Sequence, residues 1–253
     1  MNKRKILLLV ASLCIVATLA IGGTLAYFTD NDSKTNTFTI GKVDIKLVEN
    51  FDADNAKLIP GSQTTNNIKK EVFIKLESGS EDSYVWFEQL IPAALDSTDG
   101  STGANNVVHV NCPGATWDNY RTRSKYWADG QTEALALEYT WDHDPETELG
   151  LDVGTEGFIR QETIDGVVYN VYLHLYHGKL SNKTGGQTET TMGMSQVYLD
   201  SKVDSDGTNY TINGDVIDYD FSQGVNIIIR AYGIQADGFD DVYAAYKAYN
   251  GLN

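Results

Sequence analysis

Alternation of apolar and polar residues is the dominant pattern of this chain. Strict alternation over several residues is typical of a strand that has one face in the core. Turn-forming Gly, Asn, Asp and Ser residues separate the alternating stretches. The alternating stretches are Val72 to Leu76, Tyr84 to Leu90, Val167 to Tyr176, Ile217 to Phe221 and Val225 to Ala231. This number of strands predicts an all-β fold, an antiparallel β-sandwich of two sheets.

The first expected strand changes phase at a glycine. Its apolar positions are Phe38, Ile40, Val43, Ile45 and Leu47. Gly41 lies where the alternation shifts by one residue, and a glycine at such a shift is typical of a β-bulge. We therefore expect one bulged strand that ends near Leu47.

The longest alternating stretch follows the turn at Asp165-Gly166. One face carries Val167, Tyr169, Val171, Leu173 and Leu175, and the other carries Val168, Asn170, Tyr172, His174 and Tyr176. We expect the first face to lie in the core and the second, aromatic and polar face to contact water.

Two regions depart from the β pattern. Residues from about 96 to 150 are the least β-like, and we expect a mixed insertion there, with a short helix at Thr132 to Leu137 and a strand ending at Trp141. At the C-terminus, a stripe of aromatic residues at helical spacing follows Asp240, which we expect to be the N-cap of a short C-terminal helix that ends at Gly251.

The N-terminus has the pattern of a secretory signal peptide. Basic residues at positions 3 to 5 precede an apolar run from Ile6 to Ile21, and the small residues Thr24 and Ala26 occupy positions −3 and −1 of a cleavage point after Ala26. Cleavage there makes Tyr27 the new N-terminus. The alternative is an uncleaved membrane anchor, because the apolar run approaches spanning length. We thus expect a signal peptide over residues 1–26 and a single domain over residues 27–253.

Composition excludes some classes of partner. The chain of 253 residues has a net charge of −16, and loss of the three basic residues of the signal makes the secreted form more acidic still. An acidic surface repels nucleic acid and anionic lipid, so we expect no nucleic-acid partner and membrane contact only through an uncleaved signal. Of the two cysteines, Cys14 lies in the signal, which leaves Cys112 alone. Cys112 is either a small packed residue or one half of an intermolecular bridge, and the first reading is favoured.

Catalytic motifs are not recognisable. The sequence has four histidines, His109, His143, His174 and His177, and no H-E-x-x-H or G-x-S-x-G motif. In a strand, His174 and His177 face opposite ways, so they do not form a metal pair. We expect no catalytic residues.

We expect no cofactor from the residues themselves, with calcium left open. Asp204 and Asp206 precede Gly207 as carboxylates do in calcium loops, but the residues that would complete an EF-hand are missing. A second acidic loop contains Asp142, Asp144, Glu146 and Glu148. Solvated acidic loops remain the simpler reading.

Several motifs resemble those of one family. The junction G-G-T-L-A-Y-F-T-D at Gly22 to Asp30, the following T-F-T-I-G-K-V-D-I-K-L, the L-I-P-G at Leu58 and the closing A-Y-G-I-Q-A-D-G-F at Ala231 resemble the TasA/camelysin family of secreted Gram-positive proteins. The resemblance implies a jelly-roll sandwich and removal of the signal by a SipW-type signal peptidase. It also implies a place at the cell surface or in the extracellular matrix.

The same resemblance implies a function for the leader, Tyr27 to Thr37, which we expect to be mobile. TasA-like subunits form fibres of the biofilm matrix, head to tail, by donating an N-terminal strand, a mode in which main-chain hydrogen bonds give affinity. The expected strand-donor residues are Tyr27, Phe28, Phe38, Ile40, Val43, Ile45 and Leu47. The partner is then a second copy of this chain. A disordered leader is the reading that the residues alone favour.

Two other functions stay open. A camelysin-type secreted metallopeptidase would need zinc and about three fixed ligands. A cell-surface adhesin or glycan-binding module would use exposed aromatic residues such as Tyr120, Tyr126 and Trp127.

Overall fold

The computed structural model describes residues 42–52, 56–62, 64–96, 106–112, 141–143, 145–151 and 157–252. The chain divides into two units, Met1–Ile40 and Gly41–Asn253. All described residues belong to the second unit, and the following description concerns that unit.

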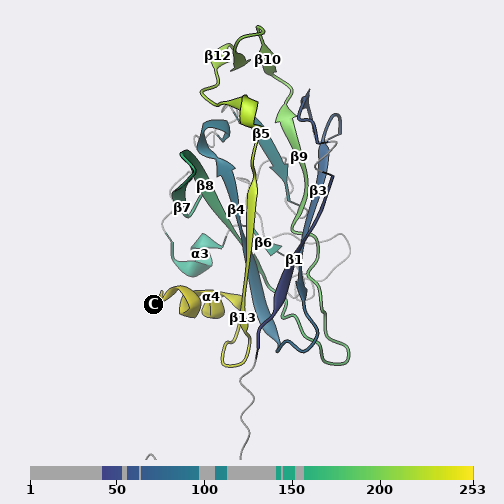
Figure 1. The fold of residues 1–253 in the computed structure, drawn as a ribbon. Coiled ribbons are helices and arrows are strands. Elements are labelled where there is room, and N and C mark those ends of the chain that lie inside the picture. The colour runs from purple at the N-terminus through teal and green to yellow at the C-terminus, as the bar shows by residue number, and fades with distance from the viewer. Residues whose placement is uncertain are drawn as a thin grey trace, which may run out of the picture. The chain divides into compact units, whose positions relative to one another are not determined.

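The described unit contains two main sheets that face each other (Figure 1). The first sheet contains β1 (Ile45–Phe51), β2 (Pro60–Gly61), β3 (Ile68–Leu76), β5 (Val108–Asn111) and β9 (Met194–Asp200), in the order β1-β3-β9-β2 with β5 also paired with β9. The second contains β4 (Ser83–Pro92), β6 (Trp141–Asp142), β7 (Arg160–Ile164), β8 (Val167–Tyr176) and β13 (Ile228–Gln235), in the order β13-β4-β8-β6 with β7 paired with β8. All pairs in both sheets are antiparallel except β2 with β9. The predicted all-β sandwich is confirmed.

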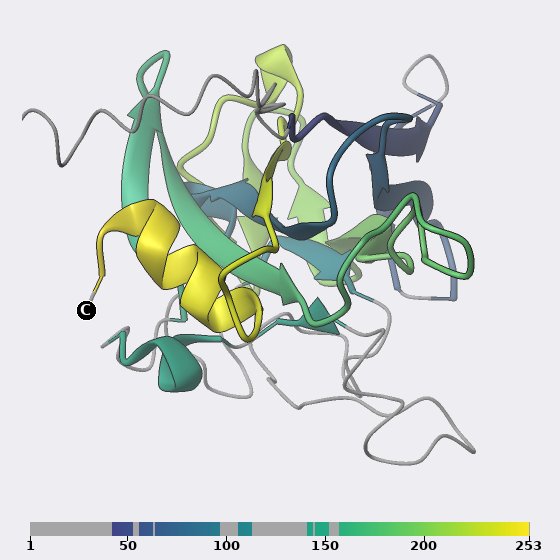
Figure 2. The ribbon, with the colours of Figure 1, turned by 90° about the horizontal axis from the view of Figure 1, so that it is seen from below.

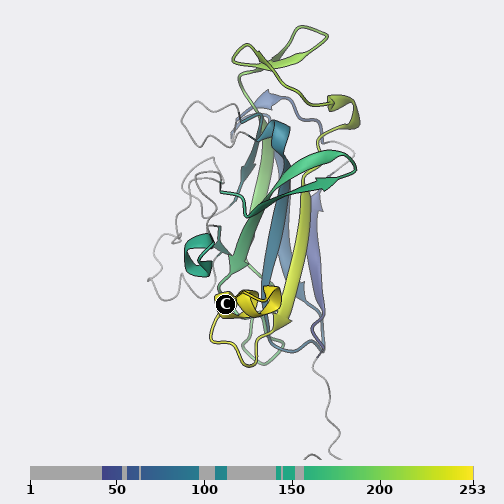
Figure 3. The same ribbon diagram turned by 90° about the vertical axis from the view of Figure 1, so that its left-hand side faces the viewer.

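Shorter elements lie around the sandwich. A small third sheet contains β10 (Val203–Ser205), β11 (Tyr210–Ile212) and β12 (Asp215–Val216). The helices are η2 (Ala93–Leu95), α3 (Glu146–Leu149), η3 (Phe221–Gln223) and α4 (Val242–Asn250). Figure 3 shows the third sheet at the opposite end of the sandwich from α4.

Alternate residues of the facing strands form the core between the sheets. Ile74 and Leu76 of β3 pack with Val85 and Phe87 of β4, and all four are buried. Each buried side chain of this size contributes about 1.5–3 kcal/mol through the hydrophobic effect. The alternation of the sequence thus correctly placed the inner face of these strands.

The outer face of the second sheet is covered as well, which changes the expectation for β8. The helix α4 lies across this face (Figure 2). Val242 and Tyr246 of this helix pack with Trp86 of β4. Strand β8 is therefore buried on both faces from Tyr169 onward. The prediction that the face of Tyr172 and His174 contacts water was wrong, because this face points toward the other sheet while the apolar face lies under the helix.

The helix α4 begins one residue later than expected. Its N-cap is Asp241, whose carboxylate accepts a hydrogen bond of 2.8 Å from the amide of Ala244. Asp240 instead accepts a hydrogen bond from the Tyr84 hydroxyl through its main-chain carbonyl. The predicted end at Gly251 is confirmed, since this glycine is the C-cap and has the left-handed conformation with φ of 65°.

Two further expectations differ in detail. The alternation at Ile217 to Phe221 does not form a strand, because the chain leaves β12 at Val216 and turns into η3. The predicted insertion contributes strands to both sheets: β5 pairs with β9, and β6 pairs with β8. The short helix expected at Thr132 to Leu137 lies outside the described residues.

Candidate functional site

Only part of the predicted strand-donor segment is described. Ala26, Tyr27, Phe28, Phe38 and Ile40 lie outside the described residues, as does the expected bulge at Gly41. Ile45 and Leu47 are half-buried in β1, opposite Leu76 and Ile74 of β3 in the same chain. Val43 is also half-buried and precedes that strand. The last residues of the predicted donor therefore belong to the chain's own sheet.

The start of β1 is held at one end of the sandwich. The main-chain carbonyls of Lys42 and Asp44 accept hydrogen bonds of 3.0 and 2.9 Å from the amides of Glu81 and Glu77, which lie in the loop between β3 and β4. Beside this start, a methyl group of Ile45 lies close to Gly233 of β13. Lys42, the first described residue before β1, therefore lies at this end of the sandwich.

A pocket lies at the other end of β1. It has a volume of about 360 Å³, and its wall includes Phe51, the last residue of β1. Seven residues of extended chain span about 20 Å, so the pocket and the start of β1 are separated by roughly that distance. The remaining lining residues that carry apolar side chains are Ala56, Leu58, Ile68, Val197, Leu199, Tyr210, Phe221, Val225 and Ile227.

Two lysines line the same pocket. Lys57 is exposed, whereas Lys70 is buried and forms an ion pair of 3.1 Å with Glu49. The ammonium group of Lys70 also lies 4.7 Å from the centre of the Phe51 ring. Lys57 thus supplies a positive charge beside an apolar pocket on a strongly acidic protein.

Of the calcium candidates, Asp204 lies in β10 and Asp206 lies in the exposed turn between β10 and β11. The carboxylate of Asp206 accepts hydrogen bonds of 2.8 and 2.7 Å from the amides of Thr208 and Asn209, and these bonds lower its pKa. Asp204 accepts one from the amide of Ser205. These contacts stabilise the turn. They give the two aspartates a structural role that does not require a bound cation.

A group of metal-ligating side chains lies elsewhere, between the sheets. Ligand atoms of Cys112, His143 and His174 lie within 4.8 Å of one another, and among the described residues this is the one such group of three. The Nδ1 atoms of His143 and His174 are 2.7 Å apart. Cys112 is 2 % exposed and His174 is fully buried, while His143 is partly buried.

The surroundings of Cys112 favour the packed reading over an intermolecular bridge. It is a free cysteine in the main core cluster. Burial raises the pKa of its thiol to about 12. His109 points to the opposite side of β5 and pairs with Asp200 at 2.8 Å, so it does not activate the thiol.

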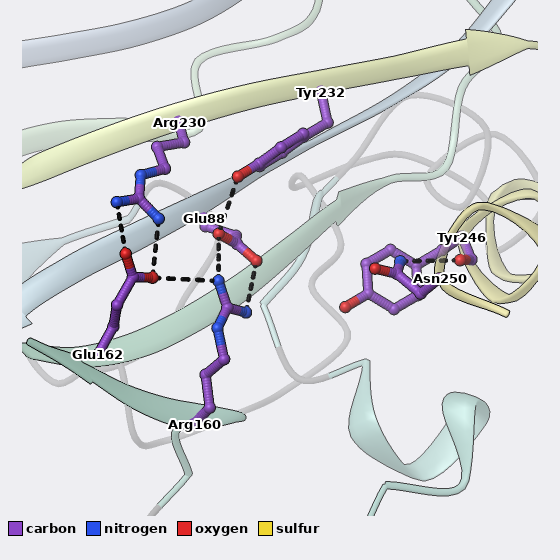
Figure 4. A network of polar contacts seen from close by, with 7 residues as sticks. All are labelled: Glu88, Arg160, Glu162, Arg230, Tyr232, Tyr246 and Asn250. Carbon is purple, nitrogen blue, oxygen red and sulfur yellow. Dashed lines mark hydrogen bonds and ion pairs between the residues drawn. The ribbon is translucent and has the colours of Figure 1, made fainter. Parts of the chain in front are cut away.

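A network of charged residues fastens the outer face of the second sheet (Figure 4). Arg160 of β7 donates hydrogen bonds of 2.7 and 2.8 Å to both carboxylate oxygens of Glu88 on β4. Arg230 of β13 binds Glu162 of β7 in the same way, and Tyr232 donates to Glu88. All four charges are paired within the sheet, so the network is structural rather than catalytic.

The aromatic stripe of α4 is largely packed against this sheet. The ring of Tyr246 meets the ring of Trp86 edge-on at 5.4 Å, and burial raises the pKa of Tyr246 to about 12. Tyr243 donates a hydrogen bond of 2.6 Å to Asp142, and burial followed by that carboxylate raises its pKa. Tyr249 remains half exposed, with its ring near Trp86.

Other expected features are not described. Tyr120, Tyr126 and Trp127, the aromatic residues of the adhesin hypothesis, lie outside the described residues. Among the described residues, no helix combines the length and the apolar character that crossing a bilayer requires.

Sequence reasoning missed both the pocket and the Cys112, His143 and His174 group. The three side chains are separated by about thirty residues each, which matches no ligand-spacing motif. The pocket is assembled from β1, β3, β9, β11 and the segment before β13, so it has no local signal. The alternation of Val108, Val110 and Cys112 could have placed Cys112 inward, but its partners depend on how the sheets pack.

Comparison with known proteins gives one match. The model of a family described as camelysin metallo-endopeptidase matches residues 1–77. No curated protein and no solved structure matches the chain.

The description of that family implies a metal, and the described residues can be tested for one. A thiol and two imidazoles form a donor set that suits zinc or copper. The three residues Cys112, His143 and His174 thus fit an ion by their chemistry. Two of them are deeply buried between the sheets, whereas zinc hydrolysis needs an open position for water and substrate. The group therefore fits a buried metal site better than a catalytic one.

Proposed function

We propose that the protein is a secreted structural subunit of extracellular fibres, and the premise is the match of residues 1–77 to the model of the camelysin family. Each copy inserts its N-terminal leader, Tyr27 to Thr37, into the pocket of the next copy. Repetition of this head-to-tail contact gives a linear fibre.

The observation that carries the proposal is the placement of the pocket relative to the start of β1. Lys42 lies just before β1, and the pocket lies beside Phe51 at the far end of that strand. A leader that leaves one end and binds at the other end of a neighbour makes a heterologous contact, which propagates instead of closing as a dimer does.

The chemistry of the leader matches that of the pocket. The leader begins with Tyr27 and Phe28, which suit apolar walls, and continues with Asp30 and Asp32. Lys57 on the pocket supplies the opposite charge. Complementary charge guides association and sets the orientation of a bound segment.

The position of β1 limits which residues are donated. Ile45 and Leu47 already pair with β3, so their release would break seven residue pairs of the chain's own sheet. The donated segment therefore precedes Lys42. Removal of the signal by a SipW-type peptidase at Ala26 would free this segment and start assembly outside the cell.

The second candidate, a secreted metallopeptidase, has the description of the matching family in its favour. Against it stand the burial of Cys112 and His174 and the position of the cluster residues beyond the matched region. A peptidase would cleave casein in a chelator-sensitive way, and the fibre proposal expects no such cleavage.

Two purified forms test the proposal, one that begins at Tyr27 and one that begins at Phe38. Both retain β1, so both should have the same circular dichroism and the same unfolding temperature. After days at moderate concentration, negative-stain microscopy should show filaments of the longer form only. If both forms remain monomers, the proposal is wrong. If both form filaments, the leader is not part of the assembly contact.

A further inference from the structure

We propose that Cys112, His143 and His174 bind one transition metal ion, zinc or copper, and that this ion joins the two sheets inside the sandwich. The proposal is independent of fibre assembly, because all three ligands belong to one chain and its test is made on the monomer.

The three ligands come from different parts of the fold. Cys112 directly follows β5 of the first sheet. His143 directly follows β6, and His174 lies within β8, and both of these strands belong to the second sheet. A shared ion would therefore connect one sheet to the other, as a disulfide does in proteins that have two cysteines to pair.

The spacing of the ligand atoms is close to what one ion requires. Zinc lies about 2.0–2.1 Å from imidazole nitrogen and about 2.3 Å from thiolate sulfur, so ligand atoms around it are about 3.3–3.7 Å apart. The three atoms here lie within 4.8 Å of one another, and the two Nδ1 atoms are 2.7 Å apart. Shifts of about 1 Å or less in side chains would centre them on an ion.

The neighbouring residues hold two of the ligands in place. The ring of His174 stacks on the ring of Phe87, with centroids 4.4 Å apart. The two residues before His143 are both anchored: Trp141 donates a hydrogen bond of 2.9 Å to the carbonyl of Thr191, and Asp142 accepts one of 2.6 Å from Tyr243. Such fixed positions lower the conformational cost of binding.

Binding has a defined proton balance. The Cys112 thiol loses its proton to solvent as sulfur bonds to the ion, and each imidazole offers the lone pair of one ring nitrogen. The donor set of one sulfur and two nitrogens is typical of zinc sites and of copper sites, and it disfavours calcium and magnesium, which prefer oxygen ligands. An ion that binds the folded chain in preference to the unfolded chain stabilises the folded state.

The test uses the protein from Tyr27 onward, stripped with chelator and then offered zinc, copper or cobalt. We expect one ion per chain by elemental analysis, and a thiolate-to-metal charge-transfer band with cobalt. The unfolding temperature should rise when the ion is added. Competition between zinc and copper identifies the preferred ion.

Three variants assign the ligands. His143→Gln changes the least buried ligand and should weaken binding at least tenfold, and Cys112→Ser should abolish the charge-transfer band. His109→Gln is the matched control, because His109 points to the opposite side of β5 from Cys112 and pairs with Asp200. It should bind as the unchanged protein does.

Two results would overturn the proposal. One is a folded, stripped protein that retains less than about a tenth of an equivalent of any of the three metals. The other is a His143→Gln variant that binds as tightly as the unchanged protein. In either case, His143 and His174 would only form a buried hydrogen bond in which one ring donates to the other.

Discussion

Arg230 and Glu162 form two hydrogen bonds of 2.8 Å each, which tie β13 to β7 although these strands are not neighbours in the sheet. The hydrogen bonds from Arg230 lower the pKa of Glu162 below its ordinary value of 4.5. The carboxylate thus remains charged in the folded protein at pH values where it is already partly protonated in the unfolded chain.

This relationship predicts a pH-dependent loss of stability. Glu162→Gln should lower the free energy of unfolding by about 1 kcal/mol at pH 7, as expected for a partly exposed two-bond ion pair. A carboxylate whose pKa is lowered in the folded state stabilises that state fully at pH values above its ordinary pKa. This stabilisation is lost as the pH falls through the folded-state pKa. The difference between the two proteins should therefore shrink below pH 4.5, the ordinary value.

Urea unfolding at several pH values measures this difference. Glu189→Gln, which changes an exposed glutamate between β8 and β9, is the control and should change stability little at any pH. An equal loss at pH 7 and pH 3 for Glu162→Gln would contradict the argument.

The N-cap of α4 gives a second prediction with a built-in control. Asp241→Ala removes the side-chain hydrogen bond to the amide of Ala244 and should cost about 1 kcal/mol. Asp240→Ala keeps the main-chain carbonyl that binds Tyr84, so it should cost a few tenths of that at most. Thermal unfolding of both variants decides between the two aspartates. A larger loss of stability for Asp240→Ala than for Asp241→Ala would contradict the assignment of Asp241 as the N-cap.

The thiol of Cys112 should be unreactive in the folded protein. Its burial and its pKa of about 12 leave very little thiolate at pH 8. In chelator-treated protein, a thiol reagent should label Cys112 at least a hundredfold more slowly in buffer than in denaturant. Rapid labelling of the folded protein would instead favour the intermolecular-bridge reading.

Assembly should depend on the charge beside the pocket. Lys57→Glu places a negative charge where Asp30 and Asp32 of the leader are proposed to bind, so we expect filament formation to slow at least tenfold, and more at low salt. Lys202→Glu makes the same charge change at another exposed lysine, which does not line the pocket. Light scattering should show that the control assembles at the normal rate. Equal slowing of both variants would mean that overall charge, and not the charge beside the pocket, controls assembly.

Much of the fold follows from the sequence by itself. The alternation of Val72, Ile74 and Leu76 identified an inner face, because side chains of a strand point to opposite sides with period two. The helix ends at Gly251 as expected, because its C-cap residue has the left-handed conformation, which glycine adopts more readily than other residues. The match of residues 1–77 to the camelysin family model agrees with the resemblance seen in local motifs.

The tertiary structure decided what touches each face. Alternation separates the two faces of β8 but does not say that α4 covers one of them and the first sheet the other, because burial depends on distant segments. For the same reason, the meeting of Cys112, His143 and His174 and the pocket beside Phe51 could not be predicted. Both are formed by strands that are far apart in the chain and are brought together only when the two sheets pack.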